Sequence, residues 1–398
     1  MEYTVKKKLN SEDQKHLVRF LRDLIGIPSL PRQEKNVIDR IGEEMSKIGF
    51  DDVYVDSVGN IIGKIGDGNK KLLFESHVDT VGIGDIARWD YHPFIGKVED
   101  GFIYGRGASD DKQGIASMVY GMKHLMQSDL ELDGTIYVVG VVQEEDCNGG
   151  AMEHVCNHIH PDGIILGEAT NLGINRGQRG RTEMMVTVKG KSAHAANPHQ
   201  GINAVYHASK IISKIESLND SFPVQDFLGK ATVAVTRMIA DPDSTNTIPD
   251  ICQFTVDRRL VLGETEEKCL GELTKILQDE GVEGNVEILE YVALSYTGFK
   301  IQLKEFFSAW ELPINHDLVK VASSGLEESF GKKPRIGKWS FSTDGVITMG
   351  KLGIPTIGFA PGDEQDAHSL NDKVNINDLY KAAVGYAHIA KSYYNKND

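Results

Sequence analysis

The sequence predicts an α/β fold with a mostly parallel central sheet covered by helices and with a small inserted α+β domain. Short apolar runs at residues 72–78, 136–142 and 164–166 alternate with helical stretches at 115–126 and 151–158. Such runs are typical of parallel strands that are buried on both faces. From residue 181 the order changes to strand, helix, two strands, helix and strand, which is the split β-α-β-β-α-β pattern.

The elements before the sheet are helical. Ser11 and Gln14 form a capping box ahead of apolar residues at helical spacing, and prolines at 28 and 31 follow this helix. A second helical stretch covers residues 37–48. The alternating run 53–55 then predicts a short strand before the turn at Gly59 and Asn60.

The inserted domain is predicted from its own run of elements, and the α/β pattern resumes after it. Its strands are expected at residues 182–188, 231–238, 252–260 and 286–291, with helices at 204–215 and 266–280. Helices at 319–330 and 376–394 and a strand at 354–359 follow. We therefore expect a discontinuous catalytic domain, residues 1–180 and 295–398, and an inserted domain, residues 181–294.

Composition excludes several classes of partner. The chain has 398 residues, 40% of them hydrophobic, and a formal net charge of -15. This charge disfavours nucleic acid or an anionic membrane as a partner, because phosphates are repelled. We expect no membrane span, since no apolar run is long enough. The four cysteines lack a C-x-x-C pair, so we expect reduced thiols and a cytoplasmic protein.

His77 and Asp79 follow one apolar run. Side chains alternate along a strand, so both point to one side, and the carboxylate can orient an imidazole that binds a metal. An H-x-D pair alone is equally typical of ordinary loop hydrogen bonds. Other features must decide between the two interpretations.

Five further acidic or imidazole residues follow strands or precede a helix. Asp110 ends the glycine-rich segment 105–110, where it could bridge two cations or cap the next helix. Glu144 and Glu145 follow the run 136–142, Glu168 follows 164–166, and His368 follows 354–359. Adjacent acids at a buried strand end repel each other unless a cation offsets their charge. Imidazole and carboxylate ligands suit zinc, with cobalt or manganese as alternatives, and a bridging carboxylate suits two divalent ions.

These motifs, in this order, resemble those of the metal-dependent peptidases and deacylases that include acetylornithine deacetylase, succinyl-diaminopimelate desuccinylase, aminoacylase and carboxypeptidase G. The resemblance covers nearly the whole chain and implies a zinc-peptidase-like catalytic domain with an inserted lid or dimerisation domain. Residues 89–93 and 105–114 are also similar to hydrolases linked by gene context to selenium metabolism.

The resemblance implies a role for each ligand. His77 and Glu168 would hold one metal, Glu145 and His368 the other, and Asp110 would bridge them. Glu168, where several branches carry aspartate, is more similar to the deacetylase and desuccinylase branch.

Glu144 would be the general base, acting on a water between the two metals that attacks an amide carbonyl. The expected substrate is a small N-acyl amino acid or short peptide with a free carboxylate. Hydrolysis of an N-carbamoyl or other non-peptide amide uses the same ligands and stays an alternative. A non-catalytic binding homologue is the alternative from another class, and the presence of Glu144 disfavours it.

The inserted domain carries the remaining candidates. The resemblance implies that His194 stabilises the oxyanion, often at the site of the neighbouring subunit of a homodimer. It also implies that Asn246 and Arg259 bind the substrate carboxylate. Arginine suits this role because its guanidinium can donate two parallel hydrogen bonds to one carboxylate. Arg258, one residue away and on the opposite strand face, is the competing choice.

Three other functional motifs are incomplete or absent in this sequence. His154 and His158 share a helix face, but Val155 stands where H-E-x-x-H needs glutamate. Met185 replaces the early glycine that a phosphate loop around Gly190 would require. The sequence also has no G-x-S-x-G motif for a serine nucleophile.

Overall fold

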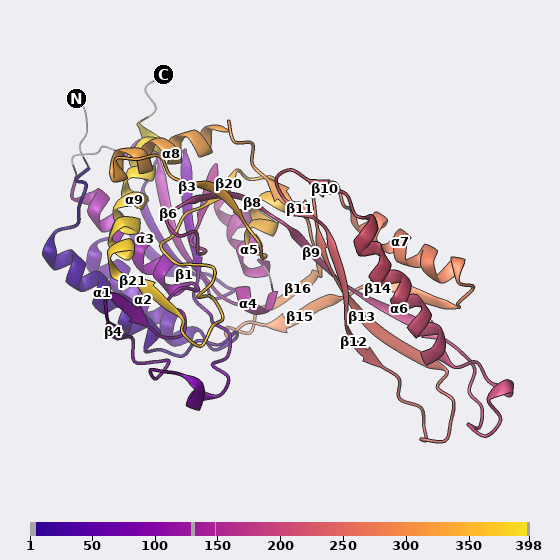
Figure 1. Cartoon of the computed structure of the whole chain (residues 1–398). Coiled ribbons are helices and arrows are strands. Elements are labelled where there is room, and N and C mark those ends of the chain that lie inside the picture. The colour runs from indigo at the N-terminus through magenta and orange to yellow at the C-terminus, as the bar shows by residue number, and fades with distance from the viewer. Residues whose placement is uncertain (1–4, 129–131, 148, 396–398) are drawn as a thin grey trace.

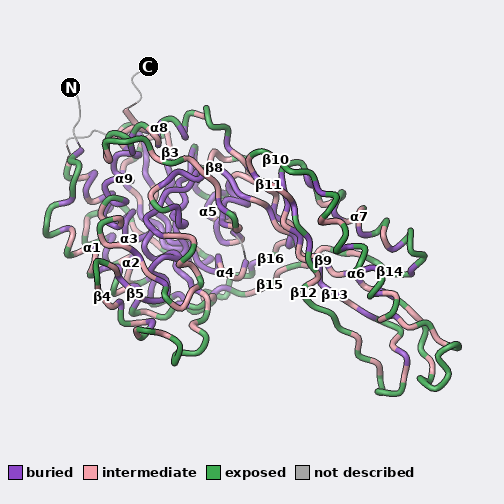
Figure 2. The backbone as a smooth tube through the Cα atoms, in the orientation of Figure 1, coloured by how far each residue is buried: buried purple, intermediate pink, exposed green. Residues whose placement is uncertain are grey.

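The computed structural model of the chain describes residues 5–128, 132–147 and 149–395. A large α/β body contains both ends of the described chain, and an elongated arm extends from it (Figure 1). Buried residues concentrate in the body, whereas much of the arm is exposed (Figure 2). Among the described residues, no helix combines the length and the apolar content that crossing a membrane requires.

The body is built on a nine-stranded sheet in the order β1-β2-β6-β3-β7-β20-β8-β18, with β19 paired to β8. Neighbours among β6, β3, β7 and β20 are parallel, and antiparallel pairs flank them on both sides. The sheet is therefore mixed, with a parallel centre. Its strands are β1 Asp52–Val55, β2 Ile61–Gly66, β3 Lys71–His77, β6 Thr135–Val141, β7 Gly163–Leu166, β8 Ile174–Gln178, β18 Trp310–Glu311, β19 Ile336–Trp339 and β20 Thr356–Gly358.

Helices pack on this sheet and on one another. Helix α3 contacts β3, α1 and α9, while α2 contacts β1 and β2 and α8 contacts α9. The helices are α1 Ser11–Ile25, α2 Lys35–Ile48, α3 Lys112–Met126, α4 Glu144–Cys147, α5 Gly150–Ile159, α8 Asp317–Phe330 and α9 Ile376–Tyr394, with single turns η1 Ile86–Arg88 and η3 Val346–Lys351. The apolar faces of the long helices and the central strands bury one continuous hydrophobic core.

The cap of the first helix differs from the prediction. Asn10, rather than Ser11, is the N-cap residue, and its side chain accepts hydrogen bonds from the backbone of Glu12 and Asp13. Asparagine and serine are both favoured at the N-cap, so the local sequence does not decide between Asn10 and Ser11.

The arm contains the second sheet, in the order β12-β13-β9-β14, all antiparallel. This order is that of the split β-α-β-β-α-β module predicted from the sequence. Inward residues of β9, such as Met184, Val186 and Val188, alternate with partly exposed ones and build a separate core with α6 and α7. The elements are β9 Gly180–Lys189, η2 Pro198–Gln200, α6 Ala204–Ser221, β12 Thr232–Ile239, β13 Ile251–Leu260, α7 Glu266–Asp279 and β14 Gly284–Ile288.

The return from the arm to the body is more complex than the predicted strand 286–291. The chain leaves the second sheet after β14, and β15 Glu290–Leu294 pairs instead with β16 Lys300–Lys304. Strand β17 Phe306–Phe307 then pairs with β9 again. The remaining short strands are β10 Val224–Gln225 with β11 Gly229–Lys230, and a three-stranded sheet of β4 Lys97–Glu99, β5 Phe102–Tyr104 and β21 Lys373–Asn375.

Candidate metal centre

The parallel strands of the central sheet place polar side chains at one edge. His77 is the last residue of β3, and Glu144 and Glu145 begin α4 directly after β6. Glu168 follows β7, and His368 lies on the loop after β20. Because the carboxyl ends of parallel strands meet at one edge, residues far apart in the sequence come together.

Asp110 joins the two imidazoles of this edge. Its Oδ1 lies 2.9 Å from Nε2 of His77, and its Oδ2 lies 3.1 Å from Nε2 of His368. His368 Nε2 is also 3.0 Å from Oε2 of Glu145, and His77 Nε2 is 3.7 Å from Oε1 of Glu168. Each imidazole therefore has the neighbours that the resemblance implies, with Asp110 between them.

The donor atoms are close enough to share ions. One atom each of His77, Asp110 and Glu145 lie within 4.8 Å of one another, and so do atoms of His77, Glu144 and Glu168. Oε1 of Glu144 is buried and has no hydrogen-bond partner among the described residues. Unsatisfied buried carboxylate oxygen next to imidazole nitrogen is the donor set that divalent zinc binds, so these residues fit a metal.

Asp79 contacts both His77, as predicted, and the two glutamates that follow β6. Nδ1 of His77 is 3.1 Å from the backbone oxygen of Asp79, and the carboxylate of Asp79 lies farther away, at 3.6 Å. That buried carboxylate also accepts hydrogen bonds from the backbone nitrogens of Glu144 and Glu145, each at 3.1 Å. Asp79 thus orients both the imidazole and the two glutamates.

The loop that carries Asp110 is held by Asp372, a residue that no local sequence pattern marked as part of the site. Its buried carboxylate accepts hydrogen bonds from the backbone nitrogens of Gly107 and Ser109, both at 2.7 Å, and pairs with Arg106. Gly107 adopts a φ of 87°, a left-handed conformation that glycine tolerates. Asp372 therefore fixes the backbone just before the bridging carboxylate.

Burial and hydrogen bonding shift the pKa values of the cluster. Burial raises the pKa of Glu144 and of Glu168 well above the ordinary glutamate range. Hydrogen bonds with Asp110 and Glu145 raise the pKa of His368 to about 10. Burial alone would raise the pKa of Asp110, but the hydrogen bonds from His368 and His77 hold it well below its usual value. Without a cation, the cluster balances its charge by retaining protons.

The cluster opens into a cleft of about 350 Å³ whose far wall carries two arginines of the arm. Arg259 on β13 and Arg181 on β9 are direct partners in the antiparallel register, and both contact Asp257. Arg181 is a further cleft residue that sequence reasoning missed, because only the strand register reveals it. The lining residues are Asp110, Glu144, Glu145, Glu168, Arg181, Arg259, Phe341, Ser342, Glu364, Ala367 and His368.

The two candidate arginines lie in different surroundings. Arg258 is fully buried and forms ion pairs with Glu264 and, at 2.6 Å, with Glu272. The side chain of Arg259 is 35% exposed and faces the cleft. Alternation along β13 separates the two guanidinium groups.

His194 and Asn246 are predicted site residues that lie away from both the metal cluster and the cleft. Both are exposed, on neighbouring loops of the arm, where the backbone nitrogen of Ala195 donates to the carbonyl of Asn246. His194 forms an isolated bridge with Thr247, and neither side chain lines the cleft beside the metal cluster. Their predicted roles stay predictions.

A carboxylate and imidazole cluster at the carboxyl edge of an α/β sheet, beside a cleft, defines the chain as a metallohydrolase. Its family follows from sequence comparison: the chain belongs to peptidase family M20/M25/M40, whose model matches residues 73–392. This confirms the resemblance drawn from the motifs, and the family implies metal-dependent hydrolysis of amide C–N bonds.

Relatives and solved structures extend the match to almost the full length. The chain is 39% identical over 382 residues to the uncharacterized protein YgeY of Escherichia coli K12, covering 96% of this chain and 95% of that protein. It is 26% identical over 391 residues to a succinyl-diaminopimelate desuccinylase of Cereibacter sphaeroides, covering 95% and 98%. The Bacillus subtilis YXEP protein, a dinuclear metal-binding M20 peptidase, shares the fold with a TM-score of 0.71 at 16% identity, covering 97% and 99%.

We predict that zinc binding releases protons. His368, with a pKa of about 10, is protonated near neutral pH, whereas zinc binds the neutral imidazole. Metal affinity should therefore fall as the pH falls, by about tenfold per pH unit for each proton displaced. Calorimetric titration in buffers of different ionisation enthalpy measures the released protons. His368→Asn should release fewer, and a heat independent of the buffer would contradict the prediction.

Proposed function

We propose that this protein hydrolyses the amide bond of a small N-acyl amino acid or short peptide that carries a free carboxylate, using two divalent metals, preferably zinc. The observation that carries the proposal is the position of Glu144, a buried carboxylate with an unpartnered oxygen beside the cluster and in the wall of the cleft. We further propose a cytoplasmic location.

The ligands are proposed as predicted: His77 and Glu168 for one ion, Glu145 and His368 for the other, and Asp110 between them. The geometry supports this division, because the two oxygens of Asp110 lie against different imidazoles. When bound, the ions supply Lewis acidity, which acidifies an attacking water and polarises the amide carbonyl.

Glu144 is the proposed proton carrier. Its carboxylate accepts the proton of the attacking water and delivers that proton to the leaving amine nitrogen. Burial supports this role, since it raises the pKa of Glu144 and a more basic carboxylate accepts a proton more readily. The backbone nitrogen of Glu144 donates a hydrogen bond to Asp79, which fixes the position of the backbone from which the Glu144 side chain extends.

The arginines of the arm support the choice of an anionic substrate. Arg259 is proposed to hold the substrate carboxylate, with Arg181 beside it on the neighbouring strand. A planar guanidinium can donate two parallel hydrogen bonds to one carboxylate. Their place across the cleft from Glu144 leaves room for a small ligand between the arm and the body.

The first test of the function is a turnover screen of the zinc-loaded protein with N-acetyl, N-succinyl and N-carbamoyl amino acids and dipeptides. We expect turnover of at least one acyl or peptide substrate, and a loss of at least about 10²-fold in Glu144→Gln with zinc content retained. Hydrolysis of N-carbamoyl compounds alone would replace the proposed substrate class. Wild-type turnover in the Glu144 variant would remove its assignment as the base.

A second test separates the two arginines. Arg259→Ala should raise KM for a carboxylate-bearing substrate by about tenfold or more and leave the melting temperature near that of the wild type. Arg258→Ala should instead destabilise the fold, by about 3–5 kcal/mol, because it leaves the buried carboxylate of Glu264 without its ion-pair partner. Kinetics and thermal unfolding are measured on both variants. A KM effect confined to the Arg258 variant would reverse the assignment.

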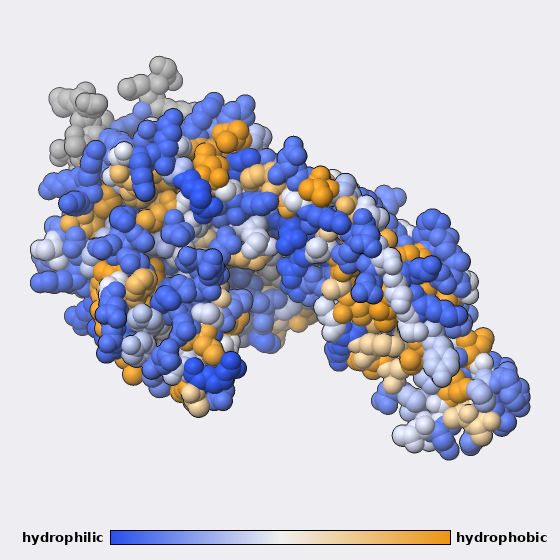
Figure 3. Space-filling model, in the orientation of Figure 1, coloured by the Kyte–Doolittle hydropathy of each residue, from blue (hydrophilic) through white to orange (hydrophobic). Residues whose placement is uncertain are grey.

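We also propose that residues 181–294 form the inserted domain, which closes over the cleft as a lid and joins two copies of the chain into a homodimer. The separate hydrophobic core of the arm supports its independence. Hydrophobic residues gather on the visible face of the arm (Figure 3), and its exposed apolar side chains include Ile202, Tyr206, Met238 and Ile251. Such exposed apolar groups are typical of interaction surfaces.

A third test addresses His194, proposed to stabilise the oxyanion in the partner's cleft because it lies away from its own. His194→Ala should lose turnover while retaining zinc. When inactive His194→Ala and Glu144→Gln proteins are unfolded, mixed and refolded together, about a quarter of wild-type activity should return, because mixed dimers contain one complete site. Each variant refolded alone is the control. Absence of recovery, with mixed dimers verified by mass, would contradict a role across subunits.

A further inference from the structure

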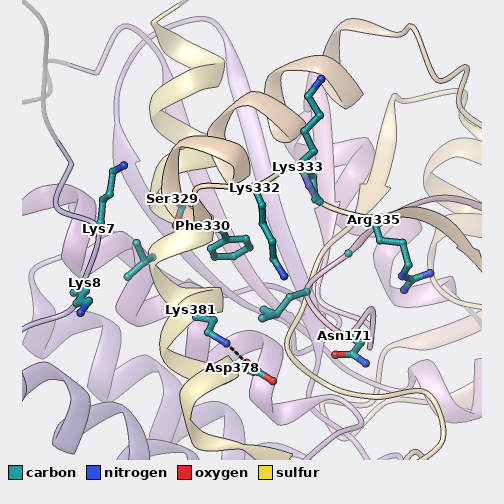
Figure 4. A pocket seen from close by; sticks show the side chains of 14 residues that line it. Lys7, Lys8, Asn171, Ser329, Phe330, Lys332, Lys333, Arg335, Asp378 and Lys381 are labelled. Carbon is teal, nitrogen blue, oxygen red and sulfur yellow. Dashed lines mark hydrogen bonds and ion pairs between the residues drawn. The ribbon is translucent and has the colours of Figure 1, made fainter.

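A second cleft, distinct from the metal centre, lies where four distant segments of the body meet. It has a volume of about 860 Å³ and shares no lining residue with the metal-centre cleft. Its walls are formed by the N-terminal segment, residues 171–173, the end of α8 with the loop that follows, and the first turns of α9 (Figure 4). We call it the cationic pocket.

Its charge is opposite to that of the molecule. Six cationic side chains line it against the single carboxylate of Asp378, a formal charge of +5 in a chain of net charge -15. The cations are Lys7, Lys8, Lys332, Lys333, Arg335 and Lys381. Like charges gathered from separate segments repel each other unless an anion offsets them.

Most of these cations have no acidic partner. Lys381 pairs with Asp378 at 2.7 Å, and Arg335 donates to the carbonyl of Thr170. Within residues 5–128, 132–147 and 149–395, no ion pair engages the four remaining lysines. Figure 4 shows the side chains of Lys332 and Lys381 extending toward the space between the Lys7 and Arg335 sides.

The shape and the remaining lining also suit a ligand. The volume lies within the range of small-molecule sites, about 300–1,000 Å³. Phe330, half-buried at the end of α8, lends the pocket an aromatic side chain. A groove of about 330 Å³ continues from it past Tyr380 and shares Lys7, Lys8 and Lys381.

We propose that the cationic pocket binds a small polyphosphorylated anion, with its phosphate chain among the lysines. Lysine ammonium groups act as point charges for phosphate, and a chain of several phosphates can offset this many cations at once. Free polyphosphate and a nucleoside triphosphate share this chemistry. Phe330 distinguishes them, because a base can stack on its ring.

The pocket adjoins segments that lead to the metal ligands. Asn171 and Leu172 on its wall follow Glu168 in the chain, and their backbone nitrogens donate to the carbonyls of Gly362 and Ala360. Those carbonyls belong to the segment that leads to His368. The pocket is thus a separate site on the same scaffold, and its occupancy does not depend on the proposed amide substrate.

The test uses the zinc-loaded full chain, titrated with tripolyphosphate and with ATP at two salt concentrations. The pocket variant is Lys332→Glu/Lys333→Glu, and the control is Arg88→Glu/Lys300→Glu, which changes the net charge equally on exposed segments outside the pocket. Any binding of phosphate at the metal centre is common to all three proteins. Circular dichroism and zinc content verify that each is folded.

We expect the pocket variant to bind tripolyphosphate at least about tenfold more weakly, the control to bind within about twofold of the wild type, and binding to weaken with salt. Equal affinities for both probes identify the phosphate chain as the ligand. Tighter ATP binding that Phe330→Leu abolishes identifies a nucleotide. No binding of either probe up to about 1 mM, or equal binding by the pocket variant and the wild type, would overturn the proposal.

Discussion

The arrangement of the metal centre depends on one carboxylate, that of Asp110. Each of its oxygens lies against a different imidazole, and these imidazoles come from β3 and from the loop after β20. Four carboxylates gather around this point, so repulsion has to be offset by protons or by cations. The raised pKa values of His368, Glu144 and Glu168 correspond to the first case, in which protons offset the repulsion. A pair of divalent ions would offset the repulsion in the second case, with the same side-chain atoms as their ligands.

Two further buried carboxylates hold this geometry without facing the cleft. Asp372 binds the backbone of the Asp110 loop, and Asp79 binds the backbone of Glu144 and Glu145. Backbone hydrogen bonds to a buried carboxylate are strong and directional, so they position a chain segment more firmly than side-chain contacts at the surface would. The cluster is therefore organised by acids of two kinds: those that meet at the metal centre and those that anchor the loops.

The sequence predicted the parts of the centre that follow from local pattern. Apolar runs located the central strands β3, β6, β7 and β20, and the acids and histidines beyond them located the edge of the sheet. Features that depend on long-range pairing were missed. Asp372 acts on Gly107 from 265 positions away, and Arg181 meets Arg259 only through the register of two strands. Strand β8 was also missed, because its polar sequence, with Asn175, Arg176 and Gln178, is buried without an apolar pattern.

Charge explains why metal and an anionic ligand belong together in this cleft. Asp110, Glu144, Glu145, Glu168 and Glu364 line it, whereas Arg181 and Arg259 both pair with Asp257. In the absence of cations the cleft opposes a substrate carboxylate, and the net charge of -15 opposes it at longer range. Two divalent ions would offset the four carboxylates of the cluster, so that the two arginines would outweigh the remaining carboxylate of Glu364 for an approaching anion. Substrate affinity should thus be coupled to metal occupancy even though the two are held by different walls of the cleft.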